Sequence, residues 1–254
     1  MNFKNIRITI LLLMLAYIGL DTFLSNARAT NWKHPLRVVI YPINADGSEQ
    51  ADKYIASLHE EQFDDIEETL QKEATRYGVK LSTPLQINLS KQLHALPPPL
   101  PHNGSTLSIM RWSLSFRFWS WKEDNYEGIT PHIRAYALFH DPKKHSSLEH
   151  STGLKNGKIA LIKLFADKHN ASHNNVVVLH ELLHTLGATD KYDLHSGYPI
   201  YPDGFAEPQQ KPLYPQRLAE IMGGRTPLTK TKAEIPVNLT KVIIGSKTAT
   251  EIGW

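Results

Sequence analysis

Two histidines one helical turn apart lie inside an apolar segment of the chain. Residues 176–186 read Val-Val-Val-Leu-His-Glu-Leu-Leu-His-Thr-Leu. Side chains four residues apart lie on the same face of an α-helix, so we expect His180 and His184 to project together, with Glu181 beside the first of them. The valines and leucines around them predict a helix buried in a hydrophobic core. The chain must therefore build a core that holds this helix rigidly, as a precise site requires.

The histidine pair predicts a metal site with nitrogen and oxygen ligands. Two imidazoles at this spacing can bind one Zn²⁺ at about 2.0–2.1 Å each. The chain contains no cysteine, so thiolate ligands are excluded. Three protein ligands are typical of a catalytic zinc. Asp190 is placed to supply the third, if Gly187 turns the chain back in a left-handed conformation at the end of the helix.

The pattern His-Glu-x-x-His-x-x-Gly-x-x-Asp, residues 180–190, resembles the zinc-binding signature of the metzincin endopeptidases, in the variant whose third ligand is aspartate. That variant is similar to snapalysin-type peptidases and, in the continuation Gly-x-x-Asp-x-Tyr-Asp, to the immune inhibitor A group. The resemblance implies a zincin fold and peptide hydrolysis by a water on one bound Zn²⁺. It implies His180, His184 and Asp190 as the zinc ligands and Glu181 as the general base.

Metzincins also place a methionine in a tight turn beneath the zinc. Met222 is the candidate, because Gly223 and Gly224 follow it and paired glycines suit such a turn,. The chain has no tyrosine two residues after Met222, where some metzincins have one. Tyr192 is the candidate donor of a hydrogen bond to the transition state.

Further residues near the signature compete for these roles. Asp193 is an alternative third ligand, and a different zincin class takes a glutamate from further along the chain. The candidates for that glutamate are Glu207, Glu220 and Glu234. Asp190, Asp193 and Asp203 are a candidate set for Ca²⁺, which prefers several oxygen ligands. His195, Tyr198 and Tyr201 could replace Tyr192 as the donor, although packing within the loop is the simpler interpretation of each.

The order of apolar patterns predicts an α+β fold, in which helices pack on a mixed, twisted sheet. β-Branched and alternating segments predict strands at 36–43, 85–89, 131–140 and 159–165,. Apolar residues at helical spacing predict helices at 49–77, at 109–121 and from about Ser172,. The aromatic residues of 109–121 are expected in the core.

The remaining segments predict connections and a sheet edge. Segment 145–152 is expected to pair along that edge, where an extended peptide substrate could add as a further strand. Residues 155–158 are expected to form a turn. Residues 191–236 are rich in proline, glycine and tyrosine and are expected to form an irregular C-terminal lobe.

Residues 1–29 are expected to direct export rather than to join the fold. Lys4 and Arg7 precede an uninterrupted apolar run from Ile8 to Leu20, and residues 27–29 offer the small-x-small pattern that signal peptidase cleaves,. The run is shorter than the roughly 20 residues that span a bilayer. We therefore expect a cleaved signal, a periplasmic or secreted protein, and one domain over residues 30–254. An uncleaved N-terminal anchor is the alternative.

The charge balance bears on the choice of partner. Lysine and arginine total 28 and aspartate and glutamate 25, a formal net charge of +3. Nothing therefore points to the concentrated basic face of a nucleic-acid-binding protein. The expected partner is a peptide or protein substrate, with no membrane contact beyond the N-terminal segment.

Two hypotheses about function follow. The first is a zinc-dependent peptidase, and the alternative is a non-catalytic zinc-binding envelope protein on the same scaffold. The presence of Glu181 favours the peptidase, because a purely structural site has no use for a base at this position.

Overall fold

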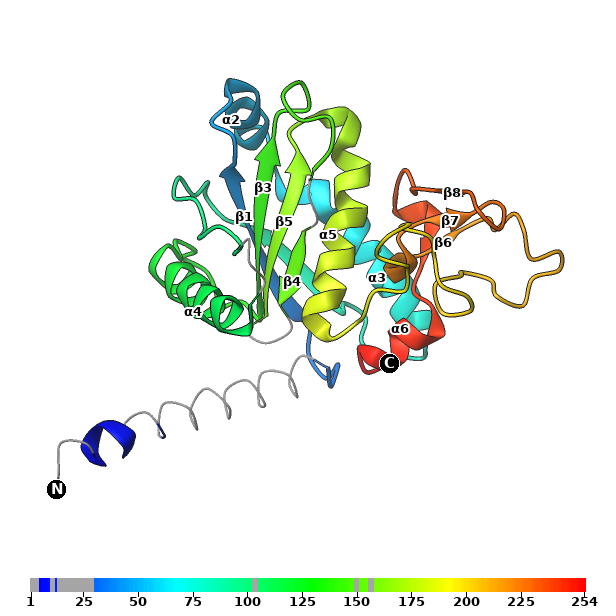
Figure 1. Cartoon of the computed structure of the whole chain (residues 1–254), viewed down its shortest axis with the longest axis horizontal. Coiled ribbons are helices and arrows are strands. Elements are labelled where there is room, and N and C mark those ends of the chain that lie inside the picture. Colours follow the sequence, from blue (N-terminus) through cyan, green and yellow to red (C-terminus); the bar gives the residue numbers. More distant parts are fainter. Residues whose placement is uncertain (1–4, 10–11, 13–29, 102–104, 149–150, 155–157) are drawn as a thin grey trace.

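A five-stranded mixed sheet forms the centre of the molecule (Figure 1). The computed structural model describes residues 5–9, 12, 30–101, 105–148, 151–154 and 158–254. Most of the predicted signal segment, including its cleavage site, lies outside these residues. The strands are β1 (Leu36–Asn44), β2 (Leu85–Leu89), β3 (Ile133–His140), β4 (Thr152–Leu154) and β5 (Ile159–Phe165).

Four neighbouring strands are parallel and one edge strand is antiparallel. The strand order is β2-β1-β3-β5-β4. In the parallel part, Val38 of β1 pairs with Ile87 of β2 on one side and with Ile133 of β3 on the other. The edge strand β4 pairs antiparallel with β5. Parallel neighbours need long crossover connections, so helices pass over the faces of the sheet.

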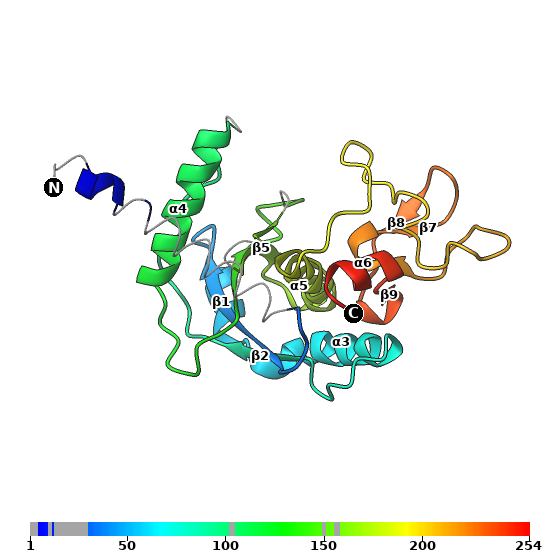
Figure 2. The same ribbon diagram turned by 90° about the horizontal axis from the view of Figure 1, so that it is seen from below.

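Alternate residues of the strands build two separate cores. Val38 and Ile40 of β1 point to the face covered by α3 (Asp64–Arg76) and α5 (Ala171–Leu186). Val39 and Tyr41 point to the opposite face, under α4 (Thr106–Lys122). Figures 1 and 2 show α4 on one side of the sheet and α3 with α5 on the other. The sheet is therefore buried on both faces, as its mostly parallel strands require.

The predicted histidine-bearing helix is confirmed as α5, which is tied to the sheet at its start. The Asn174 side chain donates to the carbonyl of Phe165, the last residue of β5, at 2.9 Å and accepts from its N–H at 3.3 Å. Leu179 and Leu183 are buried in the larger core. The helix ends at Gly187, whose φ of 112° is left-handed as predicted. Both ends and the inner face of α5 are thus held in place.

The single helix predicted over residues 49–77 is wrong. The chain forms α2 (Glu49–Ala56), the 3₁₀ turn η1 (Glu60–Phe63) and then α3. The apolar pattern steps five positions from Leu58 to Phe63, whereas one helix face repeats every three or four positions. The Ser57 hydroxyl donates to the carbonyl of Tyr54 at the end of α2. The irregular step in the apolar pattern therefore marks a break between two helices.

The four predicted strands are confirmed to within about two residues at their ends,. An edge strand does pair with β5, as predicted, but it consists of Thr152–Leu154 and not of the whole segment 145–152. The predicted turn at 155–158 lies mostly outside the described residues. A mostly parallel sheet with packed helices is compatible with the predicted α+β class.

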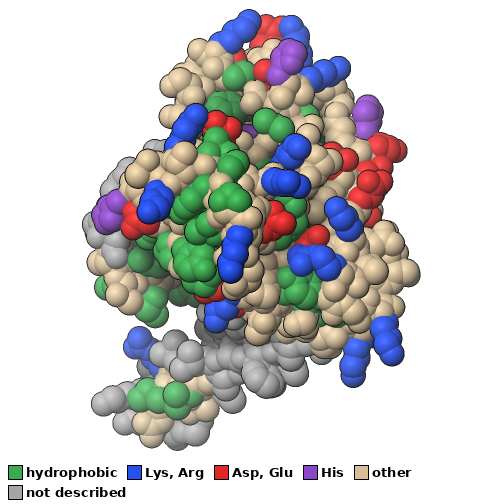
Figure 3. All heavy atoms as spheres, turned by 90° about the vertical axis from the view of Figure 1, so that its right-hand side faces the viewer, with side chains coloured by type: hydrophobic (Ala, Val, Ile, Leu, Met, Phe, Trp, Pro, Cys, Tyr) green, Lys and Arg blue, Asp and Glu red, His purple; other side chains and the backbone are tan. Residues whose placement is uncertain are grey.

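The chain after α5 contains only short elements, which confirms the predicted irregular C-terminal part. They are β6 (Ala219–Glu220), η3 (Ile221–Gly223), β7 (Thr226–Pro227), β8 (Ala233–Glu234), η4 (Leu239–Lys241), β9 (Val242–Ile243) and α6 (Ser246–Glu251). Figure 3 views the molecule from this side, and basic and acidic side chains are interspersed on that face. No helix among the described residues is both long and apolar enough to cross a bilayer.

The helix predicted over 109–121 is confirmed as α4, but the prediction that its aromatic residues lie in the core is wrong for two of them. Trp112 and Phe116 are buried in the smaller core, where Phe116 packs on Tyr136 of the sheet and Trp112 packs on Phe116. Phe118 and Trp121 are 63% and 74% exposed. Helix α4 carries apolar side chains on two opposite faces, and only the face toward the sheet is buried.

Substitutions on the two faces of α4 are expected to differ in their cost. Phe116→Ala removes a fully buried ring, so we expect the free energy of unfolding to fall by about 3–5 kcal/mol. Leu114→Ala is the control on the same helix, because Leu114 is 57% exposed and its loss should cost less than about 0.5 kcal/mol. Urea unfolding measures both values, and equal losses would contradict the packing described above.

Candidate metal centre

Three side-chain atoms of the predicted site converge on one point. His180 Nε2 and His184 Nε2 are 3.1 Å apart. Asp190 Oδ1 lies 3.3 Å from the first nitrogen and 3.1 Å from the second. Glu181 follows His180 on α5, is 5% exposed, and forms with the two histidines a group that could hold a metal ion. The predicted ligands and the predicted base therefore lie together.

Backbone carbonyls orient both imidazole rings. His180 Nδ1 lies 3.0 Å from the carbonyl O of Ile221, and His184 Nδ1 lies 2.9 Å from the carbonyl O of Ala188. A proton on each Nδ1 makes these contacts hydrogen bonds and leaves each Nε2 lone pair directed at the shared point. Such bonds from the second ring nitrogen are the usual support of metal-binding histidines.

The turn after α5 brings Asp190 back to the histidines. Gly187 N and Ala188 N donate to the carbonyl of Leu183 at 3.1 and 3.0 Å, which closes the helix end around the left-handed glycine. This closure directs the carbonyl of Ala188 at His184 and the following residues across the end of the helix. Local turn geometry therefore explains how Asp190, only three positions after Gly187, reaches the histidines.

The electrostatics of the cluster favour a charged carboxylate and a protonated phenol. Burial alone would raise the pKa of Asp190, but hydrogen bonds and charge from His180 and His184 outweigh it and hold that pKa well below its usual range. Burial raises the pKa of Tyr192 to about 12, and the negative charge of Asp190 and its hydrogen bond with Tyr192 act in the same direction. Tyr192 therefore keeps its proton at neutral pH and can act as a donor.

A tight turn lies at Met222, where the sequence predicted one. Met222 is fully buried in the same core as α5. The Glu220 carboxylate accepts from Gly223 N at 2.8 Å and from the hydroxyl of Thr248 at 2.6 Å. A Cβ on Gly223 would lie 2.4 Å from the carbonyl O of Gly204, so this position requires glycine. The role of Met222 as the floor of a metal site stays a prediction.

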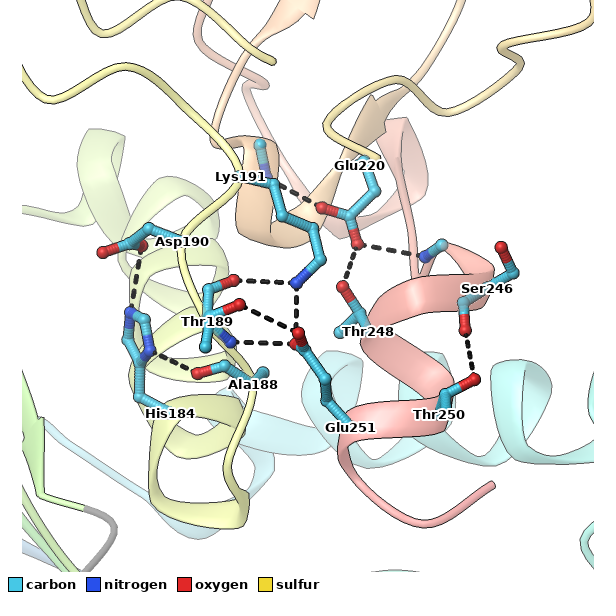
Figure 4. Close-up of polar contacts among 12 residues, drawn as sticks. His184, Ala188, Thr189, Asp190, Lys191, Glu220, Ser246, Thr248, Thr250 and Glu251 are labelled. Atoms are coloured by element: carbon cyan, nitrogen blue, oxygen red, sulfur yellow. Dashed lines mark hydrogen bonds and ion pairs between the residues drawn. The ribbon is translucent and has the colours of Figure 1, made fainter. Parts of the chain in front are cut away.

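Buried charges hold the segment that carries Asp190 (Figure 4). Lys191, 4% exposed, donates to Glu251 Oε2 and to the carbonyl of Thr189, both at 2.8 Å. Glu251, at the end of α6, also accepts from the backbone N–H and hydroxyl of Thr189 at 2.9 Å. A buried ammonium needs such partners, because its desolvation costs several kcal/mol. Helix α6 thus fixes the residues on both sides of Asp190. The sequence analysis did not predict this support from Glu251.

A cavity of about 540 Å³ opens beside the cluster, and His180, Glu181 and Tyr192 line it. Further lining residues were not singled out from the sequence. They include Lys163, Phe165, His173, Val177, Arg225 and Ile235. These residues come from β5, from α5 and from the chain after η3, so no local pattern could have grouped them. Their arrangement gives the site an apolar wall with basic groups.

The four competing carboxylates lie elsewhere or have structural partners. Asp193 Oδ1 accepts from the backbone N–H and hydroxyl of Ser196, both at 2.8 Å, in an exposed turn. Glu220 is fully buried beneath the Met222 turn. Glu207 is exposed, and Glu234 pairs with a surface lysine.

The candidate calcium ligands and the competing hydrogen-bond donors also find no support in the geometry. Among the described residues, the ligand atoms of Asp190, Asp193 and Asp203 are not grouped closely enough to hold one ion. The Tyr198 hydroxyl donates to the carbonyl of Thr229, and Tyr201 is 54% exposed. His195 lies in the exposed turn closed by Asp193.

The sequence was compared with models of protein families and with curated proteins. No protein-family model matches the chain, and no curated protein is significantly similar to it. The interpretation of the site therefore depends on its own geometry.

Glu251→Gln is expected to loosen the segment that carries Asp190. It removes the negative partner of buried Lys191, so the free energy of unfolding should fall by about 3 kcal/mol and metal affinity by roughly tenfold. Urea unfolding and titration against a chelator measure the two effects. Glu234→Gln is the control, because it breaks an exposed pair with Lys232 that is worth less than about 1 kcal/mol. Equal behaviour of the two variants would show that α6 does not support the site.

Proposed function

We propose that this chain is a zinc-dependent peptidase that hydrolyses peptide bonds with Glu181 as the general base. One observation carries the proposal: His180 Nε2, His184 Nε2 and Asp190 Oδ1 lie 3.1–3.3 Å from one another, next to the buried carboxyl group of Glu181. The resemblance of residues 180–190 to the metzincin signature supports the same activity. Under this proposal the chain acts after export.

The donor set fits Zn²⁺. Two imidazole nitrogens and one carboxylate oxygen are a typical three-ligand set of catalytic zinc, whereas Ca²⁺ takes six to eight oxygen ligands. Ligand atoms placed tetrahedrally at 2.0–2.1 Å from an ion are separated by about 3.3–3.4 Å. The separations of 3.1 and 3.3 Å among the atoms of His180, His184 and Asp190 lie close to that value.

Asp190 is the oxygen ligand that we propose, although Glu181 also has an oxygen within 4.8 Å of the histidine nitrogens. Asp190 Oδ1 lies 3.1 and 3.3 Å from the two Nε2 atoms, and its segment returns to the histidines from beyond the end of α5. Glu181 belongs to α5 and lines the cavity. This arrangement leaves the Glu181 carboxylate for proton transfer.

Glu181 carries the proton chemistry in this proposal. Its carboxylate accepts a proton from the attacking water and then donates that proton to the departing amine. Zinc, when bound, supplies Lewis acidity that lowers the pKa of a water toward about 7 and polarises the scissile carbonyl. Tyr192 keeps its phenolic proton and donates a hydrogen bond to the oxyanion that forms on the substrate.

The surroundings suit an extended peptide. The edge strand β4 lies beside β5 and near α5, so a substrate could pair along it by β-augmentation. Ser146, Ser147 and Leu148, just before β4, line the same cavity as Glu181. A metzincin-type scaffold is part of the proposal, and the left-handed Gly187 and the turn at Met222 support it.

Glu181→Gln is expected to separate metal binding from catalysis. The purified protein should hold one zinc per chain, and the variant should keep that zinc because the three proposed ligands are intact. Its kcat/KM on a library of fluorogenic peptides should fall by at least about 100-fold, since the general base is lost. Elemental analysis and peptide cleavage measure the two properties, and Glu207→Gln, at an exposed glutamate, is the control.

Two outcomes would contradict the peptidase. Undiminished cleavage by Glu181→Gln would show that another residue is the base. Retained zinc with no cleavage of any peptide, in both wild type and variant, would favour the non-catalytic zinc-binding protein instead.

The third ligand is tested by a pair of aspartates. Asp190→Asn should weaken zinc binding by at least about tenfold, because it removes the charge of the oxygen that lies next to both histidines. Asp193→Asn should leave zinc binding unchanged, since Asp193 faces an exposed turn. Competition with a chelator measures both affinities, and the reverse ranking would assign the ligand to Asp193.

A further inference from the structure

Helix α4 presents large apolar side chains outward as well as toward the sheet. The exposed set is Leu107 at 69%, Met110 at 58%, Leu114 at 57%, Phe118 at 63% and Trp121 at 74%. These positions follow one another at steps of three, four, four and three residues, which places them along one face of a helix. We name this set the outer stripe.

The outer stripe lies opposite the face of α4 that packs on the sheet. At about 100° per residue, Leu114 lies about 160° around the helix from both Trp112 and Phe116, and both of those rings are buried. Figure 2 shows α4 at the margin of the molecule, on the side away from α3 and α5. Exposure of this stripe is therefore a property of the folded domain and not of an unpacked segment.

Basic side chains flank the outer stripe. Helix α4 has 17 residues and contains Arg111, Arg117 and Lys122 but no aspartate or glutamate. By the same helical spacing, Arg111 and Lys122 lie on one side of the stripe and Arg117 lies on the other. Lys122 is paired with Glu123 just after the helix, so the outward surface of α4 combines an apolar centre with a positive rim formed mainly by Arg111 and Arg117.

The loop before α4 carries two further exposed leucines. Leu96 and Leu100 are 55% and 38% exposed. The indole N–H of Trp112 donates to the carbonyl of Pro98 at 2.9 Å, which ties this loop to the helix. The loop is thus held against the inner side of α4, where Trp112 lies.

We propose that α4 docks on the surface of a lipid bilayer that contains anionic lipids. The outer stripe enters the boundary between headgroups and acyl chains, as the apolar face of an interfacial helix does. Arg111, Arg117 and Lys122 meet the anionic headgroups, whose field attracts basic residues close to the surface. Aromatic rings such as those of Phe118 and Trp121, in contact at 5.8 Å between centroids, suit this boundary.

The charges favour lipid over a second copy of the chain. Two α4 helices paired along their outer stripes would bring Arg111 and Arg117 of each copy together, and Glu123, the acidic residue directly after the helix, is already paired with Lys122 at 2.9 Å. Like charges at such close range are destabilising. Anionic headgroups supply the missing opposite charge.

The proposal departs from the expectation of no membrane contact beyond the N-terminal segment, and it does not depend on peptidase activity.

Vesicle co-sedimentation tests the proposal. The chain from Thr30 to Trp254 includes every buried hydrophobic residue described, from Trp32 to Ile252, so it is used without the apolar N-terminal run. We expect it to bind vesicles of phosphatidylcholine mixed with phosphatidylglycerol, and to bind less at high salt. Phe118→Ser combined with Trp121→Ser should weaken binding by roughly tenfold or more. Arg111→Gln should weaken it about fivefold, and only on the anionic vesicles.

Matched controls distinguish binding through the outer stripe from nonspecific binding through other exposed apolar side chains. Leu194→Ser and Ile200→Ser remove apolar side chains that are 76% and 51% exposed on the C-terminal part, and they should leave vesicle binding unchanged. Tryptophan fluorescence of the wild type should shift to the blue with anionic vesicles, and Trp121→Phe should lose most of that shift. Urea unfolding checks that each variant is folded, and Leu114→Gln serves as a second stripe variant if the double variant is not.

Three results would overturn the proposal. The first is no binding of the wild type to anionic vesicles. The second is equal binding by the wild type and the stripe variants. The third is a dimer in sedimentation velocity that the stripe variants dissociate, without vesicle binding, which would assign the surface to a second copy of the chain.

Discussion

The burial of α5 between the sheet and the C-terminal segment is the constraint on which the rest of the site depends. Leu179 and Leu183 fix the helix on the sheet, while carbonyls of Ile221 and Ala188 orient the two imidazole rings from outside the helix. Each ring is therefore held both by its own helix and by a backbone group that follows it in the chain. A shift of α5 by a fraction of a turn would break the contact of His180 with Ile221, whereas Ala188 is bonded to the end of α5 and would move with it. Core packing and the orientation of His180 are therefore coupled.

Buried charge stabilises the part of the molecule that has little regular structure. The short elements after α5 bury few apolar residues each, and three buried or half-buried charged side chains connect them. Lys191 and Glu251 link the segment of Asp190 to α6, and Glu220 links the turn at Met222 to the same helix. Because a buried charge that loses its partner is costly, these contacts define one arrangement of the irregular segment and exclude looser ones.

The two faces of α4 show how one helix can serve both the core and the surface. Trp112 and Phe116 complete the second core under the sheet, whereas Phe118 and Trp121 extend away from it. Apolar area on the inner face contributes to folding. Apolar area on the outer face contributes nothing to the fold and is instead available to a partner, for which we propose a bilayer surface.

Local patterns in the sequence determined the strands, α5 and its histidine pair, because strand alternation, helical spacing and the glycine stop at Gly187 each depend on neighbouring residues. They also led to Asp190, since a left-handed turn has a short and definite reach. Features that join distant segments were decided by tertiary structure alone. The Lys191–Glu251 bridge joins residues 60 positions apart, Arg225 reaches the cavity from beyond the turn at Met222, and the sheet selects which aromatic residues of α4 are buried. These features depend on which segments meet in space, and periodicity within one segment carries no information about that.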